Sequence, residues 1–566
     1  MKQGRKGIPW LRMTVCICLG ILVQSAVAVA ASPTDYDYVV TDAQYKVNPA
    51  DEISDAAEIQ SILDKAKGSE KMITVYFPAG RYYIDKTLKV YSNTHIILDE
   101  KATVYRMDSL VNGTLLYNAD QNGKRNVVGG YDMSENIILE GGVWDGGNTG
   151  LARKGTDVVR IDHARNVTIK NCVIKNTYDC HILELVGVKN GLVSDCTFTG
   201  FRYKKGKEKD YTFAREAIQL ESAWTSNESN LKDTNSAWAK GSVIDGTSCQ
   251  QVTVTNNRFI DVPCGVGQHR YTKSGKHRNM DITISDNIFQ CSKEYKYCKI
   301  AITCSGTNNL NVLNNTIKGP YRFAMHVIAS DHVTIAQNRI DGIKMNGIMV
   351  DKGKITSISE NQLKNMGKHG ISVGGGTVNS IINNTIDTVG QNGICVDAGK
   401  ITDISGNVIE NTKKHGISIA GASSGKNMVT VKNISKNTIQ KAKQNGITVN
   451  AGKITNIADN VIKNVDKHGI SVIGGTIGTG KKNSNGIQQN RITTCRQNGI
   501  TASGKATVSA IGKNQITGVK NNGISLTEKA KVYWITKNTI KQCKKHGIWN
   551  GTKTKTKIKG NKGKTK

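Results

Sequence analysis

Two carboxylates and an amide are set among apolar residues in the segment AREAIQLESAW, which covers residues 214–224. Gln219 and Glu221 alternate with apolar side chains, the pattern of a half-buried β-strand, and Glu216 stands where the chain enters that strand. Cleavage of a glycosidic or uronate bond needs one group that donates a proton and another that accepts one. The segment therefore indicates acid/base chemistry on a carbohydrate, provided that neighbouring strands bring partners to the same face.

Three other segments share this apolar alternation, at residues 159–162, 183–186 and 266–269. Aligning all four by their apolar positions predicts neighbouring strands in which equivalent side chains lie above one another. A shift of one residue would move every side chain to the opposite face. One outward column then contains Arg160, Glu184, Gln219 and Gly267, the next contains Asp162, Val186, Glu221 and His269, and His181 lies beneath Glu216.

These columns predict a polar, ionisable patch on one face of the molecule, with room for several sugar units. Close acids also shift each other's pKa values, and aromatic rings and guanidinium groups bind sugar faces and uronate carboxylates. A salt-bridged surface, with Arg160 paired to Glu184, is the structural alternative. We expect acid/base roles for Glu216, Glu221, Asp162 and His269, and substrate binding by Arg160, His181, Glu184, Gln219, Arg270, His277, Trp224 and Trp238.

An internal repeat determines the architecture that must position this patch. The tripeptide Asn/His-Gly-Ile recurs with its glycine at 347, 370, 393, 416, 446, 469, 499, 523 and 547, and an Asn-x-Ile/Leu marker runs in step from Asn338. A repeat of this length cannot fold alone and must stack on its neighbours, one coil per repeat. Period-two alternation makes the segments strands, so we predict a parallel β-helix with an inward ladder of asparagine side chains at a bend.

The residues ahead of the repeats fit the same architecture. DAAEIQSILDKA places Ile59, Ile62, Leu63 and Ala66 on one helical face, which predicts a helix that caps the open edge of the first coil. The segments ITVYFPAGRYYI, LKVYSNTHIILDE, GGVWDGG and VRIDHARNVTIKN resemble the pectate-lyase-like superfamily of right-handed parallel β-helices, which includes polygalacturonases and bacterial polysaccharide lyases. The resemblance implies an all-β, right-handed parallel β-helix and a carbohydrate substrate. Superfamily lyases often use calcium, but we assign no metal and no cofactor.

Two motifs are discounted as catalytic signals. KHGISVGGG is similar to the His-Gly element of polygalacturonases, but histidine and asparagine replace each other in the same repeat position, which indicates a turn-stabilising group. The Asp-Asp pair of the polygalacturonase catalytic set is missing. Cys172 and Cys196, one coil apart, are predicted to be stacked core thiols.

The N-terminal residues indicate where the protein is located, and the distribution of charge indicates what kind of partner it binds. A basic start, an apolar run from Met13 and the pattern Ala-Val-Ala ending at Ala30 predict a secretory signal peptide. From Asp341 onward there are 36 Lys and Arg against 10 Asp and Glu, which suits a polyanionic partner and leaves nucleic acid disfavoured for lack of an aromatic platform. The predicted divisions are a signal peptide at 1–30, an extension at 31–50, a β-helix at 51–550 with an active region at 140–330 and regular repeats at 331–550, and a disordered basic tail at 551–566.

Two functions from different classes follow from these patterns. The first is a secreted enzyme, a polysaccharide lyase or glycoside hydrolase, that binds an acidic polysaccharide in a groove across residues 160–270. The second is a structural or adhesive cell-wall protein that holds an anionic polymer through its basic solenoid. Neither of these two functions requires contact with nucleic acid, or with a membrane after the signal peptide is cleaved.

Overall fold

The computed structural model contains one compact unit over residues 37–566. The predicted signal peptide lies outside the described residues. Among the described residues no helix is long and apolar enough to span a bilayer. The structure describes residues 36–110, 113–147, 156–203, 215–223, 242–268, 277–422, 425, 429–480 and 485–563.

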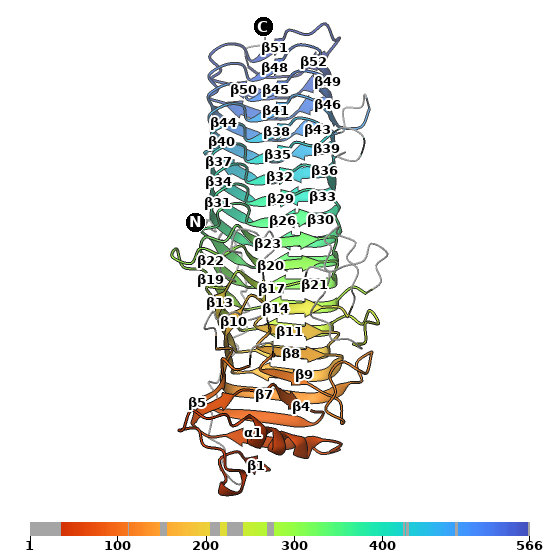
Figure 1. Cartoon of the computed structure of the whole chain (residues 1–566). Helices are drawn as coiled ribbons and strands as arrows, with labels where there is room; N and C mark the ends of the chain where they lie inside the picture. The colour runs from red at the N-terminus through yellow and green to blue at the C-terminus, as the bar shows by residue number, and fades with distance from the viewer. Residues whose placement is uncertain are drawn as a thin grey trace, which may run out of the picture. The chain divides into compact units, whose positions relative to one another are not determined.

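Strands of this unit stack in parallel into two long sheets, A and B, with β11 paired to β8 on one side and to β14 on the other (Figure 1). The fold is the predicted right-handed parallel β-helix. Sheet B consists of β4 Leu88–Val90, β6 Leu116–Asn118, β8 Val159–Asp162, β11 Leu183–Val186, β14 Glu216–Glu221, β17 Cys264–Gly267, β20 Ile300–Ser305, β23 Phe323–Ile328, β26 Ile348–Asp351, β29 Ile371–Val373, β32 Ile394–Val396, β35 Ile417–Ile419, β38 Ile447–Val449, β41 Ile470–Val472, β45 Ile500–Ala502, β48 Ile524–Leu526 and β51 Ile548–Asn550.

Sheet A forms the remaining walls of the coil, and most coils supply two of its strands. It consists of β1 Tyr38–Val39, β2 Ile73–Phe77, β3 Gly80–Ile84, β5 Thr94–Arg106, β7 Ser134–Asp145, β9 Ala164–Lys170, β10 Val173–Tyr178, β12 Lys189–Ser194, β13 Thr197–Arg202, β15 Gln250–Thr255, β16 Arg258–Ile260, β18 Met280–Ser285, β19 Ile288–Gln290, β21 Asn308–Leu313, β22 Thr316–Lys318, β24 Asp331–Ala336, β25 Arg339–Asp341, β27 Lys354–Ser359, β28 Gln362–Met366, β30 Thr377–Ile382, β31 Thr385–Val389, β33 Gly399–Ser405, β34 Val408–Thr412, β36 Val429–Ser435, β37 Thr438–Gln440, β39 Lys453–Ala458, β40 Val461–Val465, β42 Thr476–Ile477, β43 Gly486–Gln488, β44 Arg491–Cys495, β46 Thr507–Gly512, β47 Gln515–Thr517, β49 Lys531–Thr536, β50 Thr539–Lys541 and β52 Lys557–Lys559.

A short helix closes the first coil as predicted. α1 Ala56–Leu63 continues into the 3-10 turn η3 Asp64–Ala66 and buries the predicted apolar face. The Gln60 side chain accepts a hydrogen bond from the Lys89 backbone N–H at 2.8 Å and donates one to the Lys89 carbonyl at 3.3 Å. Lys89 belongs to β4, the edge strand of sheet B, so the helix satisfies a backbone that stacking leaves unpaired.

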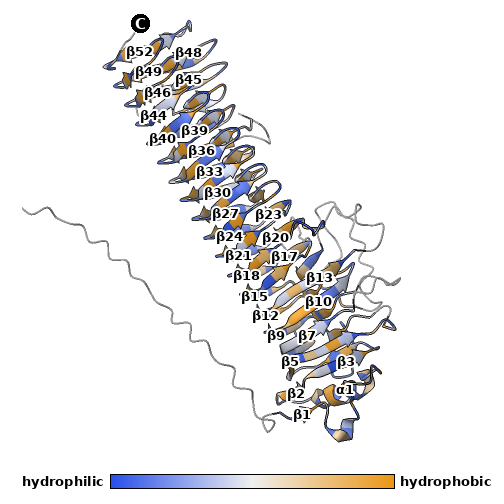
Figure 2. Cartoon of the chain, turned by 90° about the vertical axis from the view of Figure 1, so that its left-hand side faces the viewer, coloured by the Kyte–Doolittle hydropathy of each residue, from blue (hydrophilic) through white to orange (hydrophobic). Residues whose placement is uncertain are grey.

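The interior is a column of aliphatic side chains crossed by a ladder of buried amides. Figure 2 shows hydrophobic positions recurring from rung to rung. In the ladder, each asparagine side-chain oxygen accepts the backbone N–H of the preceding ladder residue, at 3.0 Å between Asn384 Oδ1 and Asn361 N. The predicted inward ladder is therefore present and consists of Asn257, Asn287, Asn315, Asn338, Asn361, Asn384, Asn407, Asn437, Asn460, Asn490, Asn514 and Asn538.

The ladder extends further than predicted. Asn561 Oδ1 accepts the N–H of Asn538 at 2.9 Å, and β52 pairs with β49. The prediction of a disordered tail is therefore wrong as far as residue 563. The dense positive charge of the tail led to the prediction of disorder and obscured Asn561 as a further ladder residue. Its side chain accepts a backbone N–H and so allows one more coil to form.

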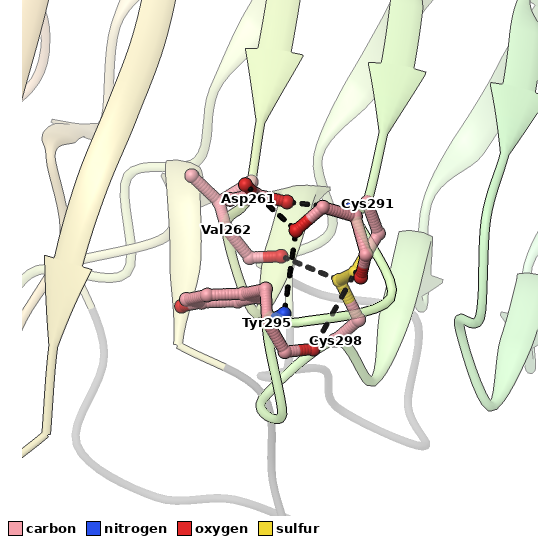
Figure 3. Close-up of a disulfide and its surroundings, with 6 residues drawn as sticks. Asp261, Val262, Cys291, Tyr295 and Cys298 are labelled. Carbon is pink, nitrogen blue, oxygen red and sulfur yellow. Dashed lines mark hydrogen bonds between the residues drawn. A yellow bond between two sulfur atoms is a disulfide. The ribbon is translucent and has the colours of Figure 1, made fainter.

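The cysteines divide into one disulfide and free thiols. Cys291 and Cys298 form a disulfide in the connection that follows β19, beside Asp261 and Tyr295 (Figure 3). Cys172 and Cys196 are free and buried, with the Cys172 N–H 3.4 Å from Cys196 Sγ, which confirms the predicted stacked thiols.

Candidate functional site

The strand register that the site depends on is the predicted one. Arg160 pairs with Glu184 and Glu184 with Gln219 across β8, β11 and β14, and Gln219 pairs with Gly267 of β17. In the neighbouring column Asp162 pairs with Val186, and Val186 with Glu221. The apolar phase of four short segments was therefore sufficient to stack these side chains correctly.

The solvent exposure predicted for the patch is wrong. Every residue of β8, β11 and β14 is buried, and Asp162 and Glu221 are 0% exposed. The side chains point away from the aliphatic interior of the coil and yet do not reach bulk water. Buried charges are tolerated only when they are paired and hydrogen-bonded, and pairing is what the structure shows.

Arg160 is the centre of this pairing. Its Nε donates to Asp162 Oδ1 at 2.8 Å and its Nη1 donates to Glu184 Oε2 at 2.6 Å. Asp157 Oδ2 lies 3.7 Å from the same Nη1, and Arg125 Nε donates to the other oxygen of Asp162 at 3.1 Å. One buried guanidinium thus holds three carboxylates, which is the structural alternative weighed for this cluster.

The charges in this network shift the pKa values of its members. Burial raises the pKa of Asp157 to about 6, and the nearby Glu184 carboxylate adds to the rise. Burial acts to raise the pKa of Asp162 as well, but Arg160 and Arg125 hold it below its ordinary value. The pKa values of the two aspartates are therefore shifted in opposite directions. Asp157 is the one of the two that can exchange a proton near neutral pH.

A second pair lies at the strand entrances. His181 Nδ1 is 3.1 Å from the Glu216 carbonyl oxygen and 3.5 Å from its carboxylate Oε2, so the predicted stacking of these residues is present. Further along β14, Gln219 Nε2 donates to Glu221 Oε2 at 3.2 Å, and the Ser222 N–H donates to Glu221 Oε1 at 3.1 Å. His181 Nδ1 therefore donates to the Glu216 carbonyl, and the Glu216 carboxylate lies beside the ring at 3.5 Å, beyond the reach of direct proton transfer.

The remaining predicted residues are not part of this described cluster. His269, Arg270, Trp224 and Trp238 lie outside the described residues, and their predicted roles stay predictions. His277 is described, and its Nδ1 lies 2.8 Å from the carbonyl oxygen of Gly246 in the connection between β14 and β15.

Sequence reasoning missed Asp157 and Cys180. Val159, Leu183 and Ile218 pair across β8, β11 and β14. Asp157, His181 and Glu216 each stand two residues before one of them, so extending the alignment backward by two residues would have found Asp157. Cys180 Sγ donates to Asp157 Oδ1 at 3.0 Å. Asp157, Cys180 and His181 each offer one ligand atom, all within 4.8 Å of one another. Mixed oxygen, sulfur and nitrogen donors suit Zn²⁺ better than Ca²⁺.

Comparison with known proteins agrees with this geometry. Residues 43–228 match the family model described as rhamnogalacturonase A/epimerase, pectate lyase-like, and residues 323–483 match the right-handed beta helix region. Together with the parallel register, these matches define a right-handed parallel β-helix whose residues 43–228 are similar to the pectate-lyase-like family.

Individual relatives belong to two functional types. The chain is 28% identical over 258 residues to the plasmin and fibronectin-binding protein A of Streptococcus pneumoniae, and the match covers 42% of this chain and 34% of that protein. The chain thus spans about a third of that relative's length. The catalytic unit of the GH87 alpha-1,3-glucanase from Streptomyces thermodiastaticus superposes with a TM-score of 0.50 at 13% identity, over 71% of this chain and 69% of the other. PfbA, a surface adhesin of Streptococcus pneumoniae, superposes with a TM-score of 0.47 at 20% identity, over 77% and 92%.

Proposed function

We propose that this protein is an extracellular, surface-associated binding protein that holds an anionic polymer through its basic regular rungs. The observation that carries the proposal is the contrast in charge and exposure along the solenoid. The acids of the early rungs are buried and tied to Arg160. The regular rungs carry most of the net positive charge, with lysines such as Lys414 and Lys467 exposed to solvent. An exposed cationic surface attracts a polyanion over a Debye length of roughly 10 Å.

The curated relative supports a binding function at the cell surface. Its name describes a protein that binds plasmin and fibronectin, and it is 28% identical to this chain over 258 residues. The predicted signal peptide fits the same location. A binding protein needs no exposed acid/base pair, which agrees with the burial of Glu216 and Glu221.

Polymer binding tests this proposal directly. We expect the purified protein to bind immobilised polyuronate and glycosaminoglycan chains but not dextran, with affinity falling steeply as salt rises. Glu216→Gln and Glu221→Gln should leave that affinity unchanged. Absence of polyanion binding at low salt, with a natively folded protein, would overturn the proposal.

A second candidate function is cleavage of a polysaccharide on the early rungs. Two observations favour it: the Glu216–His181 pair, and the pKa of Asp157, raised to about 6. The region matching the rhamnogalacturonase and epimerase model includes Asp162, Glu184 and Glu216. In this function Glu216, Glu221, Asp162 and His269 exchange protons, and Arg160 and Gln219 position the substrate.

Product analysis separates the two functions. A lyase forms unsaturated uronates that absorb ultraviolet light, whereas a hydrolase forms reducing ends only. Cleavage of any glycan in a uronate and neutral panel, abolished by Glu216→Gln and retained by Glu140→Gln on sheet A, would favour the enzyme. A silent panel would leave the binding function.

A further inference from the structure

The regular rungs carry a side-chain ladder on the edge of sheet B, formed by the residue before each repeat glycine. From Asn346 to Asn498 asparagine and histidine alternate, and each side chain as far as Asn522 accepts the backbone N–H of the next rung. Asn392 Oδ1 accepts the His415 N–H at 3.1 Å, and His415 Nδ1 accepts the Asn445 N–H at 3.2 Å. An amide oxygen and an imidazole nitrogen are equivalent acceptors here, which confirms the predicted turn-stabilising role and explains the exchange. The ladder runs through Asn346, His369, Asn392, His415, Asn445, His468, Asn498, Asn522 and His546.

The hydrogen bonds fix the state of the histidines. A ring nitrogen that accepts a backbone N–H carries no proton, so the proton of His415 and of His468 lies on Nε2. Burial and neighbouring lysines lower the pKa of both rings to about 4. Each histidine rung therefore presents a neutral N–H donor beside a lysine.

The residues that precede this ladder alternate in the same way. Their backbones stack from rung to rung, as Gln391 N–H donates to the Lys368 carbonyl and Lys414 N–H donates to the Gln391 carbonyl, both at 2.9 Å. From Lys368 to Lys467, lysine thus recurs every second rung, about 9.6 Å apart at the ordinary strand spacing. Among the described residues, no ion pair involves these lysines. The column reads Lys368, Gln391, Lys414, Gln444, Lys467, Gln497, Asn521 and Lys545.

Hydroxyl groups line the floor beside these two columns. The central residues of consecutive sheet B strands pair in register, Ser418 with Thr448, Thr448 with Ser471 and Ser471 with Thr501. A hollow of about 420 Å³ joins this floor to the ladder across residues of four successive rungs. Its far wall includes one acid, Glu528, whose carboxylate accepts the Gly504 N–H at 2.8 Å. The lining comprises Asn445, Lys467, His468, Ser471, Ile473, Gln497, Asn498, Thr501, Ser503, Ser525, Thr527 and Glu528.

We propose that this groove along sheet B, between Lys368 and Lys467, binds a linear polysaccharide in which acidic and neutral sugars alternate. The inference rests on the proposed function and names its site and its ligand. Every second rung offers a cation and an imidazole N–H for a carboxylate, and the rung between offers two neutral amides for sugar hydroxyls. Two rungs match the length of a disaccharide in an extended chain. The floor strands from β29 to β48 carry no aromatic ring, so the groove lacks the stacking platform typical of nucleic acid sites.

Replacing the lysines by the glutamine of the alternate rungs tests the site with minimal structural change. We compare Lys368→Gln/Lys414→Gln/Lys467→Gln with a control of equal charge loss, Lys354→Thr/Lys400→Thr/Lys453→Thr. The control lysines are exposed and also recur every second rung, on sheet A, where threonine fills the alternate rungs. Matching circular dichroism and melting temperatures identify the folded proteins to be compared.

Hyaluronan, in which a uronate alternates with a neutral sugar, is the probe. We expect the groove variant to lose at least tenfold in affinity and the control at most threefold. Equal losses of affinity in the two variants would show that long-range charge alone binds the polymer. That result would overturn the proposed groove site but would leave the proposed function unaffected. At equal carboxylate concentration, hyaluronan should bind more tightly than polygalacturonate or polyphosphate. If polygalacturonate or polyphosphate binds as tightly as hyaluronan or more tightly, the proposal that the ligand alternates acidic and neutral sugars is overturned.

Discussion

The early rungs β8 to β14 and the regular rungs β29 to β48 have the same fold and the same parallel register, yet they treat outward polar groups in opposite ways. The early rungs place charged side chains on the outward face of sheet B and bury them around Arg160. The regular rungs place small hydroxyl side chains there and move their charges to exposed lysines at the edge. In a stacked fold, therefore, equivalent positions on successive strands determine which side chains contact one another. The segments that surround each rung determine whether a charge is solvated or must be paired.

Arg160 gives the largest expected effect. Arg160→Met leaves Asp157, Asp162 and Glu184 buried without their guanidinium, which should lower the free energy of unfolding by about 3–5 kcal/mol. Chemical denaturation followed by circular dichroism measures the loss. Arg165→Met removes a half-exposed guanidinium from Asp132 and Glu135 and should cost less than about 1 kcal/mol. Similar losses in the two variants would contradict a special role for the buried network.

The amide ladder should be the most sensitive part of the regular rungs. Asn384→Ala removes the acceptor of the Asn361 N–H and the donor to the Ile358 carbonyl, both buried. Each unsatisfied group costs about 1–3 kcal/mol, so we expect a loss on the order of 3 kcal/mol, seen as a lower denaturation midpoint. Asn456→Ala on the outward side of sheet A, where the side chain donates to Asn433 at 3.2 Å, should cost less than about 1 kcal/mol.

Asp157 should make the early rungs less stable as pH rises. Its folded pKa of about 6 lies above the unfolded value of 3.8, so the folded state binds the proton more tightly and loses that stabilisation between about pH 4 and pH 6. Asp157→Asn keeps the acceptor for the Cys180 thiol and the His181 N–H. Its stability relative to wild type should grow by about 3 kcal/mol across this range. A difference that does not change with pH would argue against the raised pKa.

The histidine ladder should show the opposite pH dependence. The folded pKa values of His415 and His468, about 4, lie below the unfolded value of 6.5, so stability is full above pH 6.5 and is lost as the pH falls toward 4. His415→Asn/His468→Asn installs the residue of the alternate rungs. Its melting temperature should fall less than that of wild type between pH 7 and pH 4, and parallel falls would contradict the assignment.

Sequence periodicity was enough to predict the fold, the asparagine ladder and the strand register of Arg160, Glu184 and Gln219. These follow from local alternation and from repetition, because equivalent residues of successive coils must stack. Exposure of the patch could not be predicted in the same way. Glu221 has the alternation of a half-buried strand and is nevertheless 0% exposed, since burial depends on what other segments place over the strand.

The sequence by itself determined that this chain is a parallel β-helix, which residues share a column, and where its positive charge accumulates. Only the tertiary structure decided that the early acids are enclosed and neutralised, that Asp157 and Cys180 join them, and that lysine, imidazole and hydroxyl columns border one hollow. The physical reason is that register is set within and between adjacent strands, whereas solvation and charge pairing are set by side chains that are far apart in the sequence.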